Sequence, residues 1–405
     1  NGTMVQVAVT DLSAYFDDEI TAMPNLVTVG AAGTQSAIAG IPFYSDGSTS
    51  LYTHNVSGTD DTANYNTAIG YTALDAVTTG DSNTAMGYAA LGANNAGYDN
   101  VAIGHNALLL NTGGHDNVAI GNGTLDANTT GNNNTAVGRV ALGANTTGDH
   151  NLAIGQSALS GNTTGTRNTA IGYQAYTASD TENDNLAIGY QAMTTDTAGG
   201  TLNVAIGNYA LDALTSGDNN VAVGQNALGA NTTGNNNTGV GYNTLVANTT
   251  GGSNVALGAV SLSTNTDGAN NTGVGYAALK LNSTGARNTG LGRNALTANT
   301  TADDNVAVGD LAMNTNTTGA NNVAVGAQAL EANTTASDNV AVGYKALEAN
   351  TTGGDNIAIG SQSLLVNTTG GDNVSIGTDA MQSNTTGADN VAIGKDCMLA
   401  NTEGV

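Results

Sequence analysis

A five-residue motif, Asn-x-Ala-(Ile/Val)-Gly with small variations, recurs with a 17-residue period along most of this chain. Twenty copies run from Asn66 to Asn390, and the period is broken once, by an 18-residue step from Asn185 to Asn203. A typical unit reads N-V-A-I-G-x-x-A-L-x-x-N-T-T-G-x-D, as in residues 356–372 apart from Ile at position 2 and Ser at position 8, and we number its positions 1 to 17. Self-similarity at one fixed period indicates a fold in which like units stack and share one continuous core.

The repeat contains strand and turn signals and leaves no room for a helix. Positions 1 to 5 alternate in character, which is typical of a short β-strand. Glycine at position 5 and the Asn-Thr-Thr-Gly block at positions 12 to 15 are turn residues, such as Asn356, Gly360, Asn367 and Gly370. We therefore predict an all-β fold, a parallel β-roll or β-solenoid of about 20 coils. Each coil is expected to contain two short strands and two turns.

Comparison of the copies shows which positions the fold constrains. Position 4 is aliphatic or Met, and position 5 is Gly, in all 20 copies. Position 9 is Leu or Met except at Tyr176, whereas position 6 changes freely among residues such as Tyr, His, Gln, Arg and Lys. Position 6 is therefore predicted to face solvent. The asparagines at positions 1 and 12 are predicted to stack into ladders that satisfy the backbone of the turns.

The apolar side chains are too few for an ordinary globular core. The chain has no Trp and only 2 Phe, and each coil offers sizeable apolar side chains only at positions 2, 4 and 9. A thin stack of this kind leaves an apolar face uncovered. We therefore expect several chains to share one core, as an intertwined homotrimer.

Charge and composition exclude several classes of function. The formal net charge is −25, with only 7 Lys and Arg and none before Arg139, which excludes nucleic acid and anionic membrane surfaces as partners. No stretch approaches the ~20 apolar residues of a membrane-spanning helix. There is no Ser/His/Asp or Cys/His arrangement and no cofactor motif, so we expect neither catalysis nor a cofactor.

Tyrosine occupies position 6 in seven copies and provides the candidate ligand contacts. Exposed tyrosines are stiff and amphipathic and can stack on sugar rings. The best candidates for glycan contact are the neighbouring pairs Tyr71/Tyr88 and Tyr173/Tyr190. The alternative is that these rings simply cover the coil surface and favour the strand.

Aspartate recurs at position 17 near the C-terminus and provides weak cation candidates. These are Asp338, Asp355, Asp372 and Asp389. Carboxylates stacked one strand spacing apart repel one another, and a bound hard cation would relieve that repulsion. No complete calcium-binding roll motif is present, so solvated turn charges are the alternative.

The two ends of the chain differ from the repeats. Residues 1–65 hold both Pro and both Phe and are expected to form an N-terminal cap or attachment region, with residues 66–405 as the shaft. Asp11 is a candidate N-cap for a short helix. Because the sequence stops at Val405 directly after a turn, we expect a removed C-terminal segment or a docking partner there.

The Asn-x-Ala-Ile-Gly unit resembles the head repeat of YadA-type trimeric autotransporter adhesins. Longer units with Asn-Thr-Thr-Gly turns are similar to the shafts of bacteriophage tail fibres, and the 17-residue unit of this chain is longer than the 14-residue unit of the adhesin head. The resemblance covers residues 66–405. It implies an extracellular homotrimer on a virion tail, with a neighbouring fibre or baseplate protein at the N-terminal region and a cell-surface glycan as further partners.

Other functions remain open at this point. The first alternative is a bacterial surface adhesin, or an extracellular filament that assembles through the open ends of the coils. A second alternative is an ice-binding face made of the threonines at positions 13 and 14. Those threonines lie in a turn rather than on a flat strand, so we expect no thermal hysteresis.

Overall fold

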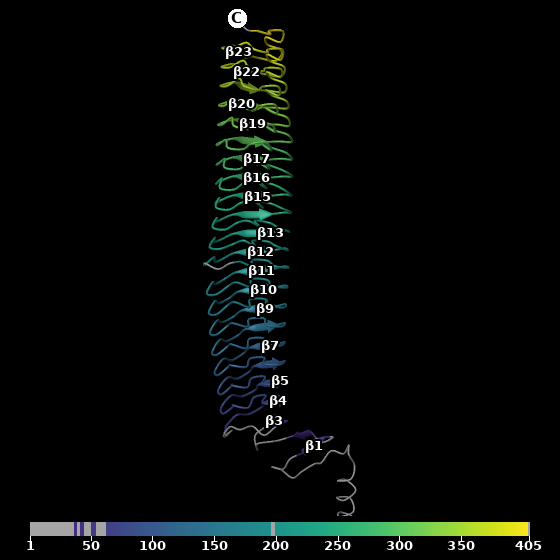
Figure 1. The fold of residues 1–405 in the computed structure, drawn as a ribbon. Helices are drawn as coiled ribbons and strands as arrows, with labels where there is room; N and C mark the ends of the chain where they lie inside the picture. Colours follow the sequence, from purple (N-terminus) through teal and green to yellow (C-terminus); the bar gives the residue numbers. More distant parts are fainter. Residues whose placement is uncertain (1–35, 39–40, 44–49, 54–61, 196–198, 404–405) are drawn as a thin grey trace, which may run out of the picture. The chain divides into compact units, whose positions relative to one another are not determined.

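The computed structural model describes residues 36–38, 41–43, 50–53, 62–195 and 199–403 (Figure 1). The chain divides into two compact units, residues 1–164 and 165–405. The predicted helix after Asp11 and the predicted docking end at Val405 lie outside the described residues.

All regular structure in the described residues is β. The strands of the first unit are β1 (Ser36–Ile38), β2 (Ile41–Phe43), β3 (Leu51–Tyr52), β4 (Thr67–Ile69), β5 (Thr84–Met86), β6 (Val101–Ile103), β7 (Val118–Ile120), β8 (Thr135–Val137) and β9 (Leu152–Ile154). Those of the second unit are β10 (Thr169–Ile171), β11 (Leu186–Ile188), β12 (Val204–Ile206), β13 (Val221–Val223), β14 (Thr238–Val240), β15 (Val255–Leu257), β16 (Thr272–Val274), β17 (Thr289–Leu291), β18 (Val306–Val308), β19 (Val323–Val325), β20 (Val340–Val342), β21 (Ile357–Ile359), β22 (Val374–Ile376) and β23 (Val391–Ile393).

Consecutive coils pair in parallel, with like positions side by side. Within β20 and β21, Val340 lies beside Ile357 and Ala341 beside Ala358. Like positions also pair across the 18-residue step, where Leu186 lies beside Val204. Among the strands that the structure describes, only β1 and β2 pair antiparallel. The prediction of an all-β parallel solenoid of about 20 coils with a 17-residue repeat is confirmed.

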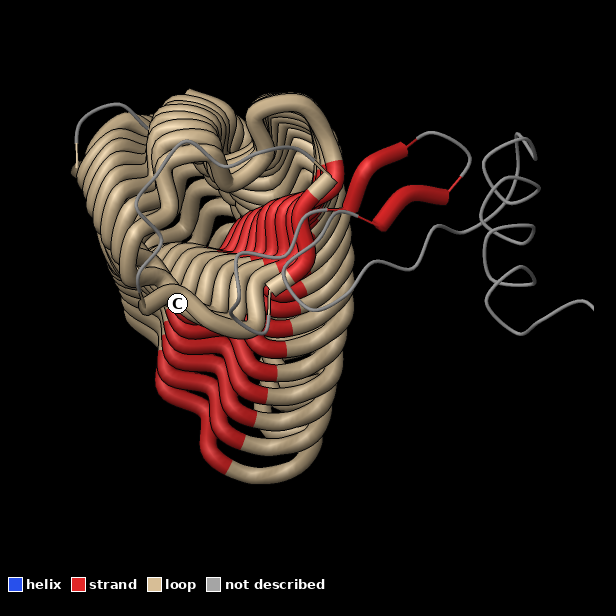
Figure 2. The backbone as a smooth tube through the Cα atoms, turned by 90° about the horizontal axis from the view of Figure 1, so that it is seen from below, coloured by secondary structure: helices blue, strands red, loops and turns tan. Residues whose placement is uncertain are grey.

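Each coil contains one strand, so the prediction of two strands per coil is wrong. The strand covers positions 2 to 4, and the remainder of each coil consists of turns and loops (Figure 2). Positions 7 and 9 are left-handed, as at Gln362 (φ 57°) and Leu364 (φ 52°), and they turn the chain where we expected a strand. A left-handed leucine costs roughly 1–2 kcal/mol. Complete burial of its side chain, worth about 1.5–3 kcal/mol, offsets that cost.

The interior of a coil is narrow and is lined by small apolar residues and asparagine. In the coil that begins at Asn339, the side chains of Ala341, Ala346 and Leu347 are fully buried, as are Asn339 and Asn350. Alanine at positions 3 and 8 lets the walls of the coil approach closely. The larger side chains at positions 2 and 4 point outward on the opposite face of the strand.

Glycine at position 5 is required by the contact between coils. Gly343 has φ +136°, and a Cβ atom there would lie 2.5 Å from the carbonyl oxygen of Gly360 in the next coil. A side chain would therefore be both strained and sterically blocked. This explains why every copy has glycine at this position.

Strand β3 covers the first regular coil. Tyr52 lies beside Ala68 and is fully buried at the place that alanine occupies in the coils. The Ser50 Oγ accepts a hydrogen bond from the Asn66 amide at 3.0 Å, and the Thr53 Oγ1 accepts one from the Gly70 amide at 3.1 Å. Residues 50–53 of the predicted N-terminal region therefore continue the stack.

Candidate functional surfaces

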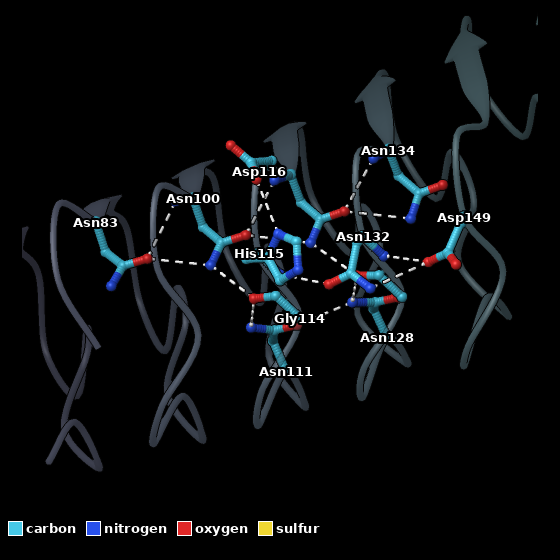
Figure 3. Close-up of polar contacts among 12 residues, drawn as sticks. Asn83, Asn100, Asn111, Gly114, His115, Asp116, Asn128, Asn132, Asn134 and Asp149 are labelled. Carbon is cyan, nitrogen blue, oxygen red and sulfur yellow. Dashed lines mark hydrogen bonds and ion pairs between the residues drawn. The ribbon is translucent and has the colours of Figure 1, made fainter. Parts of the chain in front are cut away.

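Two rows of buried asparagines hold the turns together (Figure 3). The Nδ2 groups of Asn100 and Asn111 both donate to the Gly114 carbonyl at 2.9 Å. The Asn100 Oδ1 also accepts from the amide (3.0 Å) and the Nδ2 (3.1 Å) of Asn117 in the next coil. The Asn100 side chain thus serves its own turn and the backbone of the following coil.

The predicted turn residues of the coil that begins at Asn356 follow the same pattern. The Nδ2 groups of Asn356 and Asn367 converge on the Gly370 carbonyl, each at 2.9 Å. Gly360 has φ +135°, and a Cβ atom there would lie 2.4 Å from the Gly377 carbonyl oxygen. Asn356, Asn367 and Gly370 are buried, and all four residues shape the turns of the coil.

The four position-17 aspartates lie in the turns with exposed side chains. Asp338, Asp355, Asp372 and Asp389 all have left-handed backbones, and each amide donates to a carbonyl of the preceding coil. Nowhere in the described part of the chain do three His, Cys, Asp or Glu side chains gather in a way that could hold a metal ion. The four aspartates therefore form no such group with other His, Cys, Asp or Glu side chains among the described residues.

Several basic residues form ion pairs with the next coil. Arg167 Nε lies 2.6 Å from Asp184 Oδ1, and Arg287 Nε lies 2.7 Å from Asp304 Oδ1. Hydrogen bonding to these guanidinium groups lowers the pKa of the Asp184 and Asp304 carboxyl groups. Because the side chains are exposed, these pairs align the turns without adding much stability.

A polar hollow of about 430 Å³ lies on the second unit, lined by Thr315, Gln328, Glu331, Ala332, Glu348 and Ala349. Its acidic groups already have partners within the chain. The Gln328 Nε2 donates to Glu331 at 2.9 Å, and the Lys345 Nζ donates to Glu348 at 2.8 Å. The contact with Glu348 raises the pKa of the Lys345 amine.

The predicted tyrosine pairs are brought together as ring stacks. The ring centroids of Tyr71 and Tyr88 lie 5.9 Å apart, and those of Tyr173 and Tyr190 lie 5.4 Å apart. Their rings are exposed, most strongly Tyr71 at 71%. Because the members of a pair cover part of each other's faces, the pair presents ring edges and hydroxyl groups to a ligand.

Three aromatic contacts were not predicted: two extend the predicted pairs, and one forms a separate pair. His105 stacks on Tyr88 at 5.0 Å, so the first row has three rings, and Tyr209 meets Tyr190 edge-on at 5.5 Å. A separate pair, Tyr98 and His115, stacks at 4.6 Å, and Asp116 accepts from the His115 Nδ1 at 2.8 Å. The 17-residue interval from Tyr88 to His105 and from Tyr98 to His115 was a signal for two of these contacts. Tyr209 carried no such signal, since it occupies position 7 after the 18-residue step.

The most extensive exposed feature is the outer face of the strands. In β15 the side chains of Val255 and Leu257 are 40% and 46% exposed, whereas Ala256 between them is buried. The same outward pattern holds along β4–β9 in the first unit and along β10–β23 in the second. Its exposed large apolar members are Ile69, Met86, Ile120, Ile154, Ile206, Val255, Leu257, Leu291, Val325, Ile357, Ile359, Val391 and Ile393.

No protein-family model matches the chain, and no curated protein matches it significantly. A helix of sufficient length and apolar character to cross a membrane is absent from the residues that the structure describes.

Proposed function

We propose that this chain is a structural fibre protein, the shaft of a homotrimeric bacteriophage tail fibre that supports attachment to the host cell surface. The observation that carries the proposal is the outward apolar face at positions 2 and 4 of the strands. The resemblance of the repeat to tail-fibre shafts supports the choice of fibre. The role is mechanical, without catalysis or cofactor.

The size of the apolar face favours association of chains. Partly exposed aliphatic or threonine side chains at two positions per coil repeat along β4–β9 and along β10–β23, whereas a standard interface needs only about 800 Å² per partner. Isolated soluble monomers rarely expose apolar patches beyond a few hundred Å². Three chains that place these faces around a common axis would bury them together.

The aromatic rows suit a weak, repeated contact with cell-surface glycans. Tyr71, Tyr88, Tyr173 and Tyr190 present edges and hydroxyls in pairs, and a trimer repeats each pair three times. Repetition on a rigid support raises the avidity of contacts that are weak individually.

The oligomeric state tests the carrying observation directly. Light scattering on the full chain should give a mass near three times 39.9 kDa. A variant with Val323→Glu, Val340→Glu and Ile357→Glu puts charges on the outer face of three neighbouring strands and should lower the mass without loss of β-structure. The matched control places the same charges on exposed turn threonines, as Thr318→Glu, Thr335→Glu and Thr369→Glu, and should stay trimeric. A wild-type monomer, or a strand variant that remains a trimer, would refute the proposal.

Location distinguishes the tail fibre from the alternatives. Gold-labelled antibody against the repeats should mark virion tails in electron micrographs. Labelling of bacterial surfaces, or of free filaments, would instead support the surface adhesin or the self-assembling extracellular filament.

Glycan contact is tested by a change of the paired rings to serine, as Y71S/Y88S/Y173S/Y190S. Tyr242 and Tyr276 are exposed position-6 tyrosines outside the stacked pairs, and Y242S/Y276S serves as the control. Loss of binding to host surface polysaccharide in the first variant alone would support the contact. Binding that survives the first variant would exclude these rings as the glycan site.

A further inference from the structure

Position 6 of the repeat forms an exposed row of side chains along six consecutive coils of the first unit. Backbone bonds between neighbouring coils keep these residues side by side. The amide that follows each row residue donates to the carbonyl of the previous one, as Asn106 does to Tyr88 and Val140 does to Asn122, each at 2.9 Å. The members of this position-6 row, all exposed, are Tyr71, Tyr88, His105, Asn122, Arg139 and Gln156.

One end of the position-6 row is an aromatic stack. The Tyr88 ring lies between its two neighbours, with its centroid 5.9 Å from that of Tyr71 and 5.0 Å from that of His105. Three stacked rings present a continuous surface of ring edges and polar groups to solvent. Stiff amphipathic rings of this kind are suited to contact with sugar rings.

The other end of the row contains an arginine without a carboxylate partner. The other three arginines each pair with an aspartate of the next coil, as Arg293 does with Asp310 at 2.8 Å. Arg139 forms no such pair with any residue that the structure describes. Its neighbours in the row are the uncharged Asn122 and Gln156. The Arg139 guanidinium is therefore free to bind an external anion.

The surroundings of Arg139 are poor in acidic groups, although the whole chain has 32 Asp and Glu against 7 Lys and Arg. The row itself has no acidic residue. Asp126, which approaches Gly123 from position 10, is partly buried and forms no ion pair with Arg139. One unpaired cation matches an isolated carboxylate, whereas nucleic acid requires clustered basic residues. Position 7 of the same coils is also uncharged and holds Thr72, Ala89, Asn106, Gly123, Val140 and Ser157.

The spacing of the coils matches the spacing of sugar units. Neighbouring strands lie about 4.8 Å apart, and a pyranose unit advances an extended glycan by a similar length. His105 and Arg139 are two coils apart, which corresponds to about 9.6 Å along the stack, or one disaccharide. A glycan that lies along the coils would therefore contact the aromatic end with one sugar and reach Arg139 with a sugar one disaccharide away.

We propose that the position-6 row of the first unit binds a linear acidic glycan, with sugar rings against Tyr71, Tyr88 and His105 and a sugar carboxylate at Arg139. This inference rests on the proposed contact with cell-surface glycans and adds the charge and the orientation of the ligand. The planar guanidinium holds a carboxylate through two parallel hydrogen bonds. The contact is weak in one chain, and a trimer repeats it three times.

A matched pair of probes tests the charge of the ligand. A hyaluronan hexasaccharide carries a carboxylate on every second sugar, and its carboxyl-reduced form is the same chain without charge. In saturation-transfer NMR titrations of the full chain, the acidic probe should bind more tightly than the reduced probe, and added salt should narrow the difference. Equal affinity for the two probes, or no binding of the acidic probe, would overturn the proposal.

Variants of the row test the residues. Arg139→Gln should weaken binding of the acidic probe by about fivefold, the fold-change that corresponds to an exposed ion pair of ~1 kcal/mol, and should leave the reduced probe unaffected. The matched control is Arg293→Gln, also at position 6, which should change neither affinity because Asp310 already pairs with that arginine. Tyr88→Ser removes the middle ring and should weaken both probes. Wild-type affinity of Arg139→Gln or Tyr88→Ser for the acidic probe would contradict the assignment.

Failure of this inference is distinguishable from failure of the proposed fibre role. A chain with a trimeric mass and no preference for the acidic probe would overturn the ligand assignment alone. A monomeric chain whose preference for the acidic probe depends on Arg139 would refute the trimer and support the ligand assignment.

Discussion

The asparagines at positions 1 and 12 look alike in sequence, but the structure predicts that replacing the two costs different amounts of the free energy of unfolding. We consider Asn288→Leu at position 1 and Asn282→Leu at position 12 of neighbouring coils. The Asn288 Oδ1 accepts the backbone amide of Asn305 at 3.0 Å, and its Nδ2 donates to Asn271 Oδ1 at 3.2 Å and to the Ala302 carbonyl at 2.7 Å. Both side chains are fully buried.

Leucine at position 288 leaves the Asn305 amide buried without its acceptor, at a cost of about 1–3 kcal/mol. Two further side-chain bonds are lost, at a net cost of about 0.5–1.5 kcal/mol each. The expected loss is therefore roughly 2–6 kcal/mol of the free energy of unfolding. The larger side chain gives little in return, because the coil interior is filled.

Leucine at position 282 should cost less. The Asn282 Nδ2 donates to Asn265 Oδ1 and to the Gly285 carbonyl, and its Oδ1 accepts only the Asn299 side chain. No backbone amide among the described residues depends on it, and the Gly285 carbonyl keeps its bond from Asn271 at 2.7 Å. Val77 and Leu214 already occupy this position in other coils and are fully buried. The three side-chain bonds of Asn282 are worth about 0.5–1.5 kcal/mol each. Burial of a leucine, worth about 1.5–3 kcal/mol, offsets much of that cost at a position that already accepts leucine, so we expect a smaller loss than for Asn288→Leu.

Urea unfolding followed by circular dichroism measures both variants, and hydrogen exchange should show loss of protection at the Asn305 amide only in Asn288→Leu. If the two variants lose equal free energy of unfolding, the hydrogen bond from the Asn305 amide to Asn288 is not what makes position 1 more important than position 12. Protection of the Asn305 amide in Asn288→Leu would do the same.

Three further predictions concern the coil interior and its charges. Gly275→Ala should destabilise the chain by about 2 kcal/mol or more, because φ is +131° and the new Cβ would lie 2.5 Å from the Gly292 carbonyl oxygen. Gly285→Ala should cost less, because Ala302 and Ala336 occupy the same position of the repeat in other coils. Equal losses of melting temperature in the two variants would contradict the prediction. Leu279→Ala should cost about 2–5 kcal/mol because the side chain is fully buried, whereas exposed Leu281→Ala should change the unfolding midpoint little. Arg287 lowers the pKa of Asp304, so the stabilisation from this ion pair is present above the ordinary carboxyl pKa and is lost as the pH falls through the lowered pKa. Asp304→Asn should therefore reduce the fall of the melting temperature at acidic pH. An unchanged fall would count against a stabilising role of the pair.

The sequence alone determined the repeat, its 17-residue period and the parallel stacking of like positions. The strand at positions 2 to 4 was predictable because alternating side chains are typical of a β-strand. The turn at position 5 was predictable because a glycine in every copy indicates a backbone that other residues rarely adopt. The pairing of Tyr71 with Tyr88 and of Tyr173 with Tyr190 also followed from the period, since residues one repeat apart lie side by side in a solenoid.

Only the tertiary structure decided which way the strand faces. Alternation separates two faces but does not say which one is inside, and the expectation from size alone would place Val340 and Val342 in the core instead of Ala341. Alanine is inside because the buried leucine at position 9, such as Leu279, already fills the interior, and a Cβ at position 3 of the next coil (Gly290) would lie 3.2 Å from its Cγ. The Glu182 carboxylate accepts from the amides of Asp180 and Thr181 in its own turn, a relation between atoms that no spacing in the sequence expresses.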